Sequence, residues 1–353
     1  MSERAVAIIG YGLAGRVFHA PLITATTGLR VAAIVTADAR RSAQAAQEHP
    51  GAAVLPSAEA LFSQAGTIDA VVVATSNDSH AQLAMRAIDH GLAVVVDKPL
   101  ASSSQEAELL IAHARARQTL LTVFQNRRWD SDQLTLARLM AEGALGQVLR
   151  YESRFERWRP HPRLDVWREA LPPEQGGGLL LDLGSHLVDQ ALQHFGPVQS
   201  VYAEIAHRRQ TPADDDVFLA LTHRSGTISH LHASALVAAP GPRLRVLGSQ
   251  AALRVREIDS QEERLRAGRR PDTDPDWGAE PAHAHPRLIT GERSVPLVPE
   301  RGAWQTFYAL LGQALTSGGA AAPPVDPGDA VAVLDVLEAA RASAASGEVI
   351  TLA

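Results

Sequence analysis

Residues 6–15 read Val-Ala-Ile-Ile-Gly-Tyr-Gly-Leu-Ala-Gly, an apolar run that ends in three glycines spaced G-x-G-x-x-G. The run has the length of a buried strand, and a helical pattern follows it. In such a unit the first glycine permits a tight turn, the second lets backbone N–H groups approach a pyrophosphate, and the third allows close helix–strand packing. The stretch predicts a dinucleotide site, with a glycine turn that binds nothing as the alternative. Its residues are Gly10, Tyr11, Gly12, Leu13, Ala14 and Gly15.

Apolar runs recur through the first 125 residues and predict further strands, while the segments between them have the pattern of helices. Strands that alternate with helices form a parallel, doubly wound sheet. We therefore expect a dinucleotide-binding Rossmann domain over residues 1–125, with ligands at the carboxyl ends of its strands. The expected strands are 6–9, 31–35, 70–74, 93–96 and 120–124, and the expected helices include 57–64 and 79–89.

The end of the second strand bears on the choice of cofactor. An acidic residue that binds the ribose 2′-hydroxyl of NAD is expected about 20 residues past the glycines. Thr36 stands there instead, and Arg40 and Arg41 follow. A hydroxyl with two guanidinium groups suits a 2′-phosphate, so NADP(H) is favoured over NAD(H). In the alternative interpretation Asp38 reaches the ribose and the two arginines only solvate the start of a helix.

Two more strand ends carry polar side chains to the same edge of the predicted sheet. The run 70–74 continues into Thr75-Ser76-Asn77-Asp78-Ser79-His80, and the run 93–96 continues into Asp97-Lys98-Pro99. Lys98 is the single lysine among 33 basic residues. Where arginine serves as the cation everywhere else, a surviving lysine indicates a need for a compact, titratable amine.

The alternation stops after residue 124, and strand-like runs with glycine turns dominate the remainder. This pattern favours antiparallel hairpins. We expect a second α/β domain over 126–353 with an open, mainly antiparallel sheet, and a surface loop over 266–286. The expected helix is 130–142, and the expected strands are 147–155, 198–206, 217–223, 227–236, 244–247 and 252–256.

One helical stretch of this second half concentrates polar groups. Asp182, His186, Asp189 and Gln193 are spaced i, i+4, i+7 and i+11, which places them on one stripe of a helix. Two interpretations stay open from spacing alone. The stripe either faces water or contributes to a site.

These motifs together resemble the glucose–fructose oxidoreductase/inositol dehydrogenase (Gfo/Idh/MocA) family. The resemblance rests on the glycine motif, on T-x-N-x-x-H at Thr75, Asn77 and His80, on the family's E-K-P at Asp97-Lys98-Pro99, and on D-x-x-x-H at Asp182 and His186. Asp97 replaces the family's Glu, and Ser76 stands where Pro is common. Stretches 10–21 and 125–130 are most similar to NADP-dependent scyllo-inositol dehydrogenase-like members.

The resemblance implies that Lys98, Asp182 and His186 are a catalytic trio and that the two strand-end motifs bind cofactor. Alcohol oxidation needs a base for the hydroxyl proton, and imidazole, with an ordinary pKa of about 6.5, suits that task near neutrality. Asp182 would orient His186, and Lys98 would hydrogen-bond the reacting oxygen. Trp and Arg side chains suit a polyhydroxylated ring, so we add Asn126, Arg127 and Trp167 to the trio as substrate-binding residues.

Composition excludes several classes of function. A net charge of −6 argues against nucleic acid and anionic membranes as partners. The chain has no cysteine, and the motifs His283-Ala284-His285 and Asp214-Asp215-Asp216 lack a matching third ligand motif, so we expect no metal. Without a secretory or membrane-spanning apolar run, a cytoplasmic location is expected.

The leading hypothesis is an NADP(H)-dependent oxidoreductase of an inositol or sugar. The family's open sheet further implies a homodimer or homotetramer. One alternative is a non-catalytic sugar or dinucleotide sensor, which would have no need of Lys98, Asp182 and His186 together. Another is a reductase of an imine or biliverdin-type substrate, against which the same trio argues.

Overall fold

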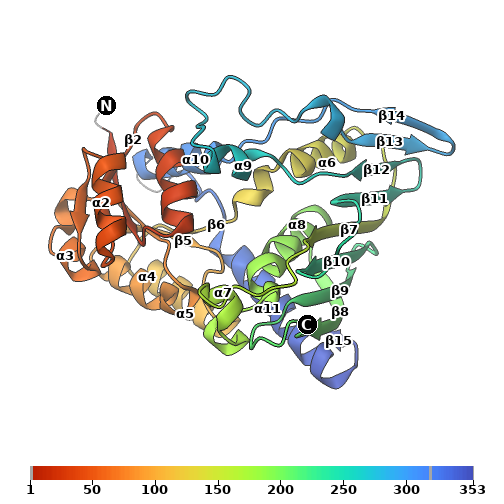
Figure 1. Ribbon diagram of the computed structural model, residues 1–353, viewed down its shortest axis with the longest axis horizontal. Helices are drawn as coiled ribbons and strands as arrows, with labels where there is room; N and C mark the ends of the chain where they lie inside the picture. The colour runs from red at the N-terminus through yellow and green to blue at the C-terminus, as the bar shows by residue number, and fades with distance from the viewer. Residues whose placement is uncertain (1–2, 318–319, 353) are drawn as a thin grey trace. The chain divides into compact units, whose positions relative to one another are not determined.

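The computed structural model describes residues 3–317 and 320–352, which divide into two compact units (Figure 1). Each unit is assembled from three separate stretches of chain. The first comprises the described residues of Met1–Asn126, Gln261–Trp277 and Ala303–Val331. The second comprises those of Arg127–Ser260, Gly278–Gly302 and Ala332–Ala353. The chain therefore returns to the first unit twice after leaving it. The predicted domains 1–125 and 126–353 do not include these two returns.

The first unit contains a parallel sheet in which the described residues form six strands, ordered β3-β2-β1-β4-β5-β6. This is the strand order of the Rossmann fold, and it confirms the doubly wound sheet predicted from the sequence. The strands are β1 (Arg4–Ile9), β2 (Leu29–Val35), β3 (Ala53–Leu55), β4 (Ala70–Val73), β5 (Ala93–Asp97) and β6 (Leu121–Phe124). The helices are α1 (Ala20–Thr24), α2 (Ala39–Glu48), α3 (Ala58–Phe62), α4 (His80–Asp89), α5 (Ser104–Ala116), α9 (Gln261–Arg266) and α10 (Gln305–Thr316).

Three neighbouring strands of this sheet are covered on both faces. Every residue of β4, β5 and β6 is buried, as expected for a parallel sheet with helices on both sides. From β1 the chain runs through β2 to β3 on one side and then crosses back to β4 on the other side of β1, so the strand order reverses beside β1. Ligands of open α/β sheets bind at such a reversal, outside the carboxyl ends of the strands.

The second unit contains a sheet of nine strands within the described ranges, ordered β14-β13-β12-β11-β7-β10-β9-β8-β15. All its neighbours are antiparallel except β7 and β10, which confirms a mainly antiparallel sheet. The strands are β7 (Val148–Glu156), β8 (Val198–Ala206), β9 (Asp216–His223), β10 (Ile228–Ser234), β11 (Leu244–Gly248), β12 (Ala252–Val255), β13 (Arg287–Thr290), β14 (Arg293–Pro296) and β15 (Ile350–Thr351). The helices are α6 (Ser131–Ala141), α7 (Trp167–Ala170), α8 (Ser185–Phe195) and α11 (Pro327–Ser346).

The core of the second unit forms where helices pack on this sheet. Helix α8 contacts β7 and β10 (Figure 1). Leu187 of α8 and Leu337 of α11 join Tyr151 and Phe155 of β7 in one buried apolar cluster. Burial of this cluster fixes the orientation of α8, and with it the polar side chains near its N-terminus.

The segment 266–286 is only partly the surface loop that its composition predicts. Trp277 is buried, and its indole Nε1 donates a hydrogen bond to Oε1 of Gln305, at 2.9 Å. A buried indole with a satisfied N–H anchors the segment to the first unit. Within the described ranges, no helix is long and apolar enough to cross a membrane.

Candidate active site

The three glycines of the first turn have different surroundings. Gly10 has a φ of +100°, and a Cβ there would meet the carbonyl oxygen of Ala74. A Cβ on Gly15 would overlap the carbonyl of Gly10, whereas a Cβ on Gly12 has nothing within 4 Å. Gly10 and Gly15 are therefore required by packing, while the backbone at Gly12 is open to a ligand. That openness fits a dinucleotide pyrophosphate approaching the turn.

Tyr11 is the one aromatic residue of the glycine motif, and it points away from solvent. Its hydroxyl donates a 2.6 Å hydrogen bond to Glu48 at the end of α2, and burial is the main cause that raises the pKa of this phenol. Arg16 also pairs with Glu48, at 2.7 Å. The side chain of Tyr11 thus ties the glycine turn to α2.

The end of β2 carries the residues from which the cofactor preference is predicted. Thr36 is buried, and the side chain of Asp38 accepts a 2.8 Å hydrogen bond from the backbone N–H of Arg41, as the N-cap of α2. Arg40 and Arg41 are exposed, and their guanidinium groups make no ion pair or side-chain hydrogen bond with the residues that the structure describes. Asp38 therefore has a capping function, and two cations at a helix N-terminus remain for an anion.

The two strand-end motifs are joined by His80. Its Nδ1 lies 2.8 Å from the carbonyl oxygen of Pro99, and its Nε2 lies 3.3 Å from that of Thr75. The Lys98–Pro99 peptide bond is cis, and the backbone N–H of Lys98 donates to the carboxylate of Asp97, at 2.9 Å. The carboxyl ends of β4 and β5 are thus held together, and Asn77 lies buried in the same connection.

Asp182 and His186 lie close together in the second unit. Asp182 is in a π-helical turn, Leu180–Gly184, that leads directly into α8, where His186 is the second residue. His186 is only 6% exposed, and Asp189 is buried and accepts hydrogen bonds of 2.6 and 2.9 Å from Arg128. The middle of the stripe is therefore buried, while Asp182 is partly exposed and Gln193 at the far end is exposed. A π-helical turn of this kind often marks a functional position.

Arg168, which was not among the predicted substrate-binding residues, contacts Asp182. Its Nε donates a 3.2 Å hydrogen bond to Oδ1 of Asp182, and its guanidinium lies 4.3 Å from the centre of the Trp167 ring. The backbone carbonyl of Arg168 also accepts from the N–H of Gly178, at 3.0 Å. Predicted substrate-binding residue Trp167 therefore belongs to the surroundings of Asp182.

The other two predicted substrate-binding residues are buried. Asn126 is the last residue of the first stretch of the first unit, and Arg127 lies in the interior of the second unit. Arg127 pairs with Asp130 at 3.3 Å, and its guanidinium lies 4.9 Å from the centre of the Phe155 ring. These contacts give Arg127 a structural role within its own unit.

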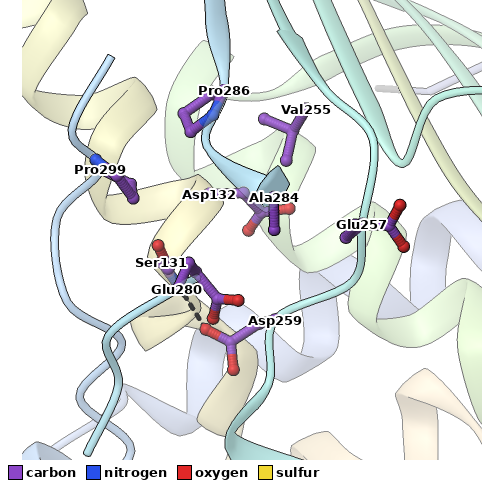
Figure 2. Close-up of a pocket in the computed structure, with 9 residues that line it drawn as sticks. All are labelled: Ser131, Asp132, Val255, Glu257, Asp259, Glu280, Ala284, Pro286 and Pro299. Atoms are coloured by element: carbon purple, nitrogen blue, oxygen red, sulfur yellow. Dashed lines mark hydrogen bonds between the residues drawn. The ribbon is translucent and has the colours of Figure 1, made fainter. Parts of the chain in front are cut away.

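A separate acidic pocket lies in the second unit (Figure 2). Asp259 accepts a 2.7 Å hydrogen bond from the backbone N–H of Ser131, and Asp132 lies 3.4 Å from Arg243. Asp259 is thus used by the fold, whereas both carboxylate oxygens of Asp132 are buried without a hydrogen-bond partner among the described residues. Across 3–317 and 320–352, no group of three or more His, Asp or Glu side chains could hold a metal ion.

Comparison with known proteins identifies the family to which the two units belong. Residues 4–125 match the model of an oxidoreductase family with an NAD-binding Rossmann fold, and residues 134–254 match the Gfo/Idh/MocA C-terminal domain. The chain belongs to the Gfo/Idh/MocA oxidoreductase family. It is 38% identical over 335 residues to the uncharacterized oxidoreductase YdgJ of Escherichia coli, with 94% of each chain covered.

Two further members of the Gfo/Idh/MocA family extend the comparison. The chain is 32% identical over 351 residues to scyllo-inositol 2-dehydrogenase (NADP(+)) IolW of Bacillus subtilis, covering 98% of this chain and 95% of that one. The solved structure of the putative oxidoreductase yvaA from Bacillus subtilis superposes with a TM-score of 0.92 at 32% identity, covering 100% and 99% of the two chains. The family and its enzymatic, oxidoreductase character predicted from the sequence are confirmed.

Proposed function

We propose that this chain is an NADP(H)-dependent oxidoreductase that interconverts a secondary alcohol and a ketone of an inositol or a related sugar. Lys98, the single lysine, carries the proposal, since it follows β5 at the ligand-binding edge of a Rossmann sheet. The buried His186 beside Asp182 supplies the acid–base pair. The similarity to an NADP-dependent inositol dehydrogenase over nearly the full length supports the substrate class.

In this proposal Gly12, Thr36, Arg40 and Arg41 hold the dinucleotide. When bound, the nicotinamide accepts or donates the hydride. His186 accepts the hydroxyl proton during oxidation and returns it during reduction. Asp182 favours the imidazolium form of His186 because it is an anion one turn away. Lys98 stabilises negative charge on the reacting oxygen, as preorganised cations do in such reactions.

The direct test follows NADPH absorbance at 340 nm against a panel of inososes and keto-sugars, and NADP⁺ reduction with the matching polyols. We expect turnover with at least one polyhydroxylated ring. His186→Ala should lower kcat by about 10²–10⁴-fold with NADPH binding retained. Lys98→Arg should also lose most of its turnover, because guanidinium does not deprotonate and is bulkier. Tight NADPH binding without turnover on the panel would favour the sensor.

We also propose that the chain forms a homodimer or homotetramer through the nine-stranded sheet. Along β9 and β10, Phe218, His230 and His232 alternate with the core residues and are only half-buried. Aromatic side chains grouped on one sheet face are typical of protein interfaces. Sedimentation velocity of the wild type and of Phe218→Glu tests this, with a shift to monomer expected for the variant.

A further inference from the structure

Behind the Lys98 turn, a buried polar chain crosses the interior of the first unit. Nδ1 of His19 lies 2.6 Å from the hydroxyl of Tyr308, and Nε2 of the same ring faces Oδ1 of Asp97 at 4.0 Å. Both His19 and Tyr308 are 0% exposed. Oδ1 of Asp97 in turn accepts the backbone N–H of Lys98. The polar chain therefore runs from Tyr308 in α10, through His19 at the end of the π-helical segment Ala14–His19, to Asp97, the residue next to the single lysine.

The proton positions in this chain follow from its geometry. Burial lowers the pKa of His19 to about 4, so its ring is neutral and carries one proton. If Tyr308 donates to Nδ1, that proton is on Nε2 and faces the Asp97 carboxylate. The opposite tautomer would turn a lone pair toward an anion. Asp97, Tyr308 and His80 are the charged or titratable groups that act on His19, and only Asp97 among them carries a carboxylate.

Aromatic packing alone does not explain a histidine at this position. The His19 ring lies 4.3 Å from the Phe124 ring, centre to centre, and is edge-on to Tyr308. A phenylalanine could make such contacts. Instead, Nε2 of His19 is buried without a hydrogen-bond partner among the described residues, which costs stability. A polar atom kept at such a cost, facing the carboxylate next to a candidate catalytic group, indicates a functional constraint.

We propose that His19 and Tyr308 are positioning residues for Lys98, acting through the Asp97 carboxylate. The Tyr308 hydroxyl fixes the tautomer of His19. The N–H of His19 then faces the Asp97 carboxylate at 4.0 Å and orients it by electrostatic attraction, without a hydrogen bond, while Asp97 holds the Lys98 backbone. The inference rests on the proposed function, since it assigns these two residues to the support of its lysine. It also accounts for Asp at position 97, where the family's E-K-P motif has Glu, because the imidazole of His19 faces the shorter carboxylate side chain.

The single lysine permits a test that does not depend on turnover. Protein labelled with ¹³C at the lysine Cε gives one lysine NMR signal, and a small acylating reagent has only Lys98 and the N-terminal amine as lysine-type targets. The informative pair is His19→Gln against His19→Asn. Glutamine places an amide N–H near the position of Nε2, whereas asparagine places its amide near Nδ1 and leaves nothing toward Asp97. Tyr308→Phe removes only the hydroxyl.

The matched control is Phe307→Leu. The ring centres of Phe307 and Tyr308 are 5.3 Å apart, so this variant perturbs the same aromatic cluster. Phenylalanine has no polar group, so no hydrogen bond is removed. We expect His19→Asn and Tyr308→Phe to shift the Lys98 signal and change its acylation rate about fivefold or more, with kcat reduced about tenfold and KM for NADPH little changed. His19→Gln should recover most of the loss. Phe307→Leu should lower only the melting temperature.

The positioning proposal is overturned if His19→Asn and Tyr308→Phe lower the melting temperature yet leave the Lys98 signal, its acylation rate and kcat within twofold of wild type. If one of the three variants His19→Asn, His19→Gln and Tyr308→Phe does not fold, the other two still decide the question. Absence of turnover in the wild type would count against the proposed function alone. The NMR and acylation measurements would still report on the positioning of Lys98.

Discussion

The guanidinium of Arg168 lies between the carboxylate of Asp182, at 3.2 Å, and the ring of Trp167, at 4.3 Å. The side chains of Arg168 and Asp182 are about a quarter exposed, at 26% and 24%. A pair this exposed contributes at most about 1 kcal/mol to stability. Its importance is electrostatic and geometric, since it fixes the direction of a carboxylate one turn from His186.

Replacing Arg168 by Gln should therefore affect activity more than stability. We expect kcat/KM to fall about tenfold or more while the free energy of unfolding changes by less than about 1 kcal/mol. Arg163→Gln is the matched control, because Arg163 lies in the same segment and pairs with Glu169 at 3.1 Å. Steady-state kinetics and urea denaturation separate the two quantities. Equal activity of the Arg168 and Arg163 variants would show that the Asp182 pair has no role in turnover.

Most strands of the fold were predictable from the sequence, but the return of later segments to the first unit was not. Apolar runs such as 70–74 and 93–96 are continuous, so they identify buried parallel strands without other information. The short strand β3 and the strands β13 and β14 were missed, because their residues are exposed or half-exposed and lack a clear period. The return of 261–277 and 303–331 to the first unit depends on Trp277, Trp304 and Tyr308, whose burial no local pattern reveals.

The glycine motif allows a prediction with an internal control. Gly12→Ala adds a methyl group to open space, so the free energy of unfolding should change by less than about 1 kcal/mol, while NADPH affinity falls at least about tenfold. Gly15→Ala places its Cβ on the Gly10 carbonyl and should destabilise the protein by about 3 kcal/mol or more. Denaturant titration and fluorescence titration with NADPH measure both. A Gly12→Ala protein that binds NADPH normally would place the pyrophosphate elsewhere.

The candidate site was predictable where a motif keeps its residues adjacent. The strand-end motifs and the Asp182–His186 spacing are visible within a few residues of sequence. Arg168 is 14 residues from Asp182, and Tyr308 is 289 residues from His19, so only the fold brings each pair together. Both were indistinguishable from ordinary surface or core residues in the sequence.

Two buried histidines give the protein a pH dependence of known sign. Burial lowers the pKa of His194 to about 4, as it does for His19, and Nε2 of His194 lies 3.0 Å from Oε1 of Gln133. The unfolded chain binds these protons at about pH 6.5, so between pH 6.5 and 4 it holds more protons than the native state. The contribution of these two histidines to the free energy of unfolding is therefore fully present above pH 6.5 and is lost as the pH falls toward 4.

The expected slope is about 1.4 kcal/mol per pH unit for each of these histidines. Urea denaturation at pH 7, 6 and 5 measures it. His194→Gln removes one of the two titrating groups. The part of the slope of the unfolding free energy against pH that comes from this pair should therefore fall by about half. An unchanged slope in that variant would assign the acid sensitivity to other groups.

The final prediction concerns the preference for NADP(H), which rests on the end of β2. Thr36 is buried at that strand end, Asp38 is engaged as the cap of α2, and the exposed Arg40 and Arg41 have no partners among the described residues. Charge-assisted hydrogen bonds to a 2′-phosphate contribute about 1.5–3 kcal/mol, which corresponds to about 10–150-fold in affinity for NADPH over NADH.

Replacing both arginines by Gln should abolish most of this preference by weakening NADPH binding while leaving NADH binding nearly unchanged. Thr36→Asp should reverse the preference, because a carboxylate accepts hydrogen bonds from a free 2′-hydroxyl and repels a 2′-phosphate. Asp38→Asn keeps a capping oxygen and serves as the control, with no change in preference expected. Fluorescence titrations with both dinucleotides at two salt concentrations measure these affinities, since the additional charge of the 2′-phosphate should make NADPH binding weaken more steeply with ionic strength than NADH binding. A wild-type protein that binds NADH as tightly as NADPH would refute the assignment of Thr36, Arg40 and Arg41.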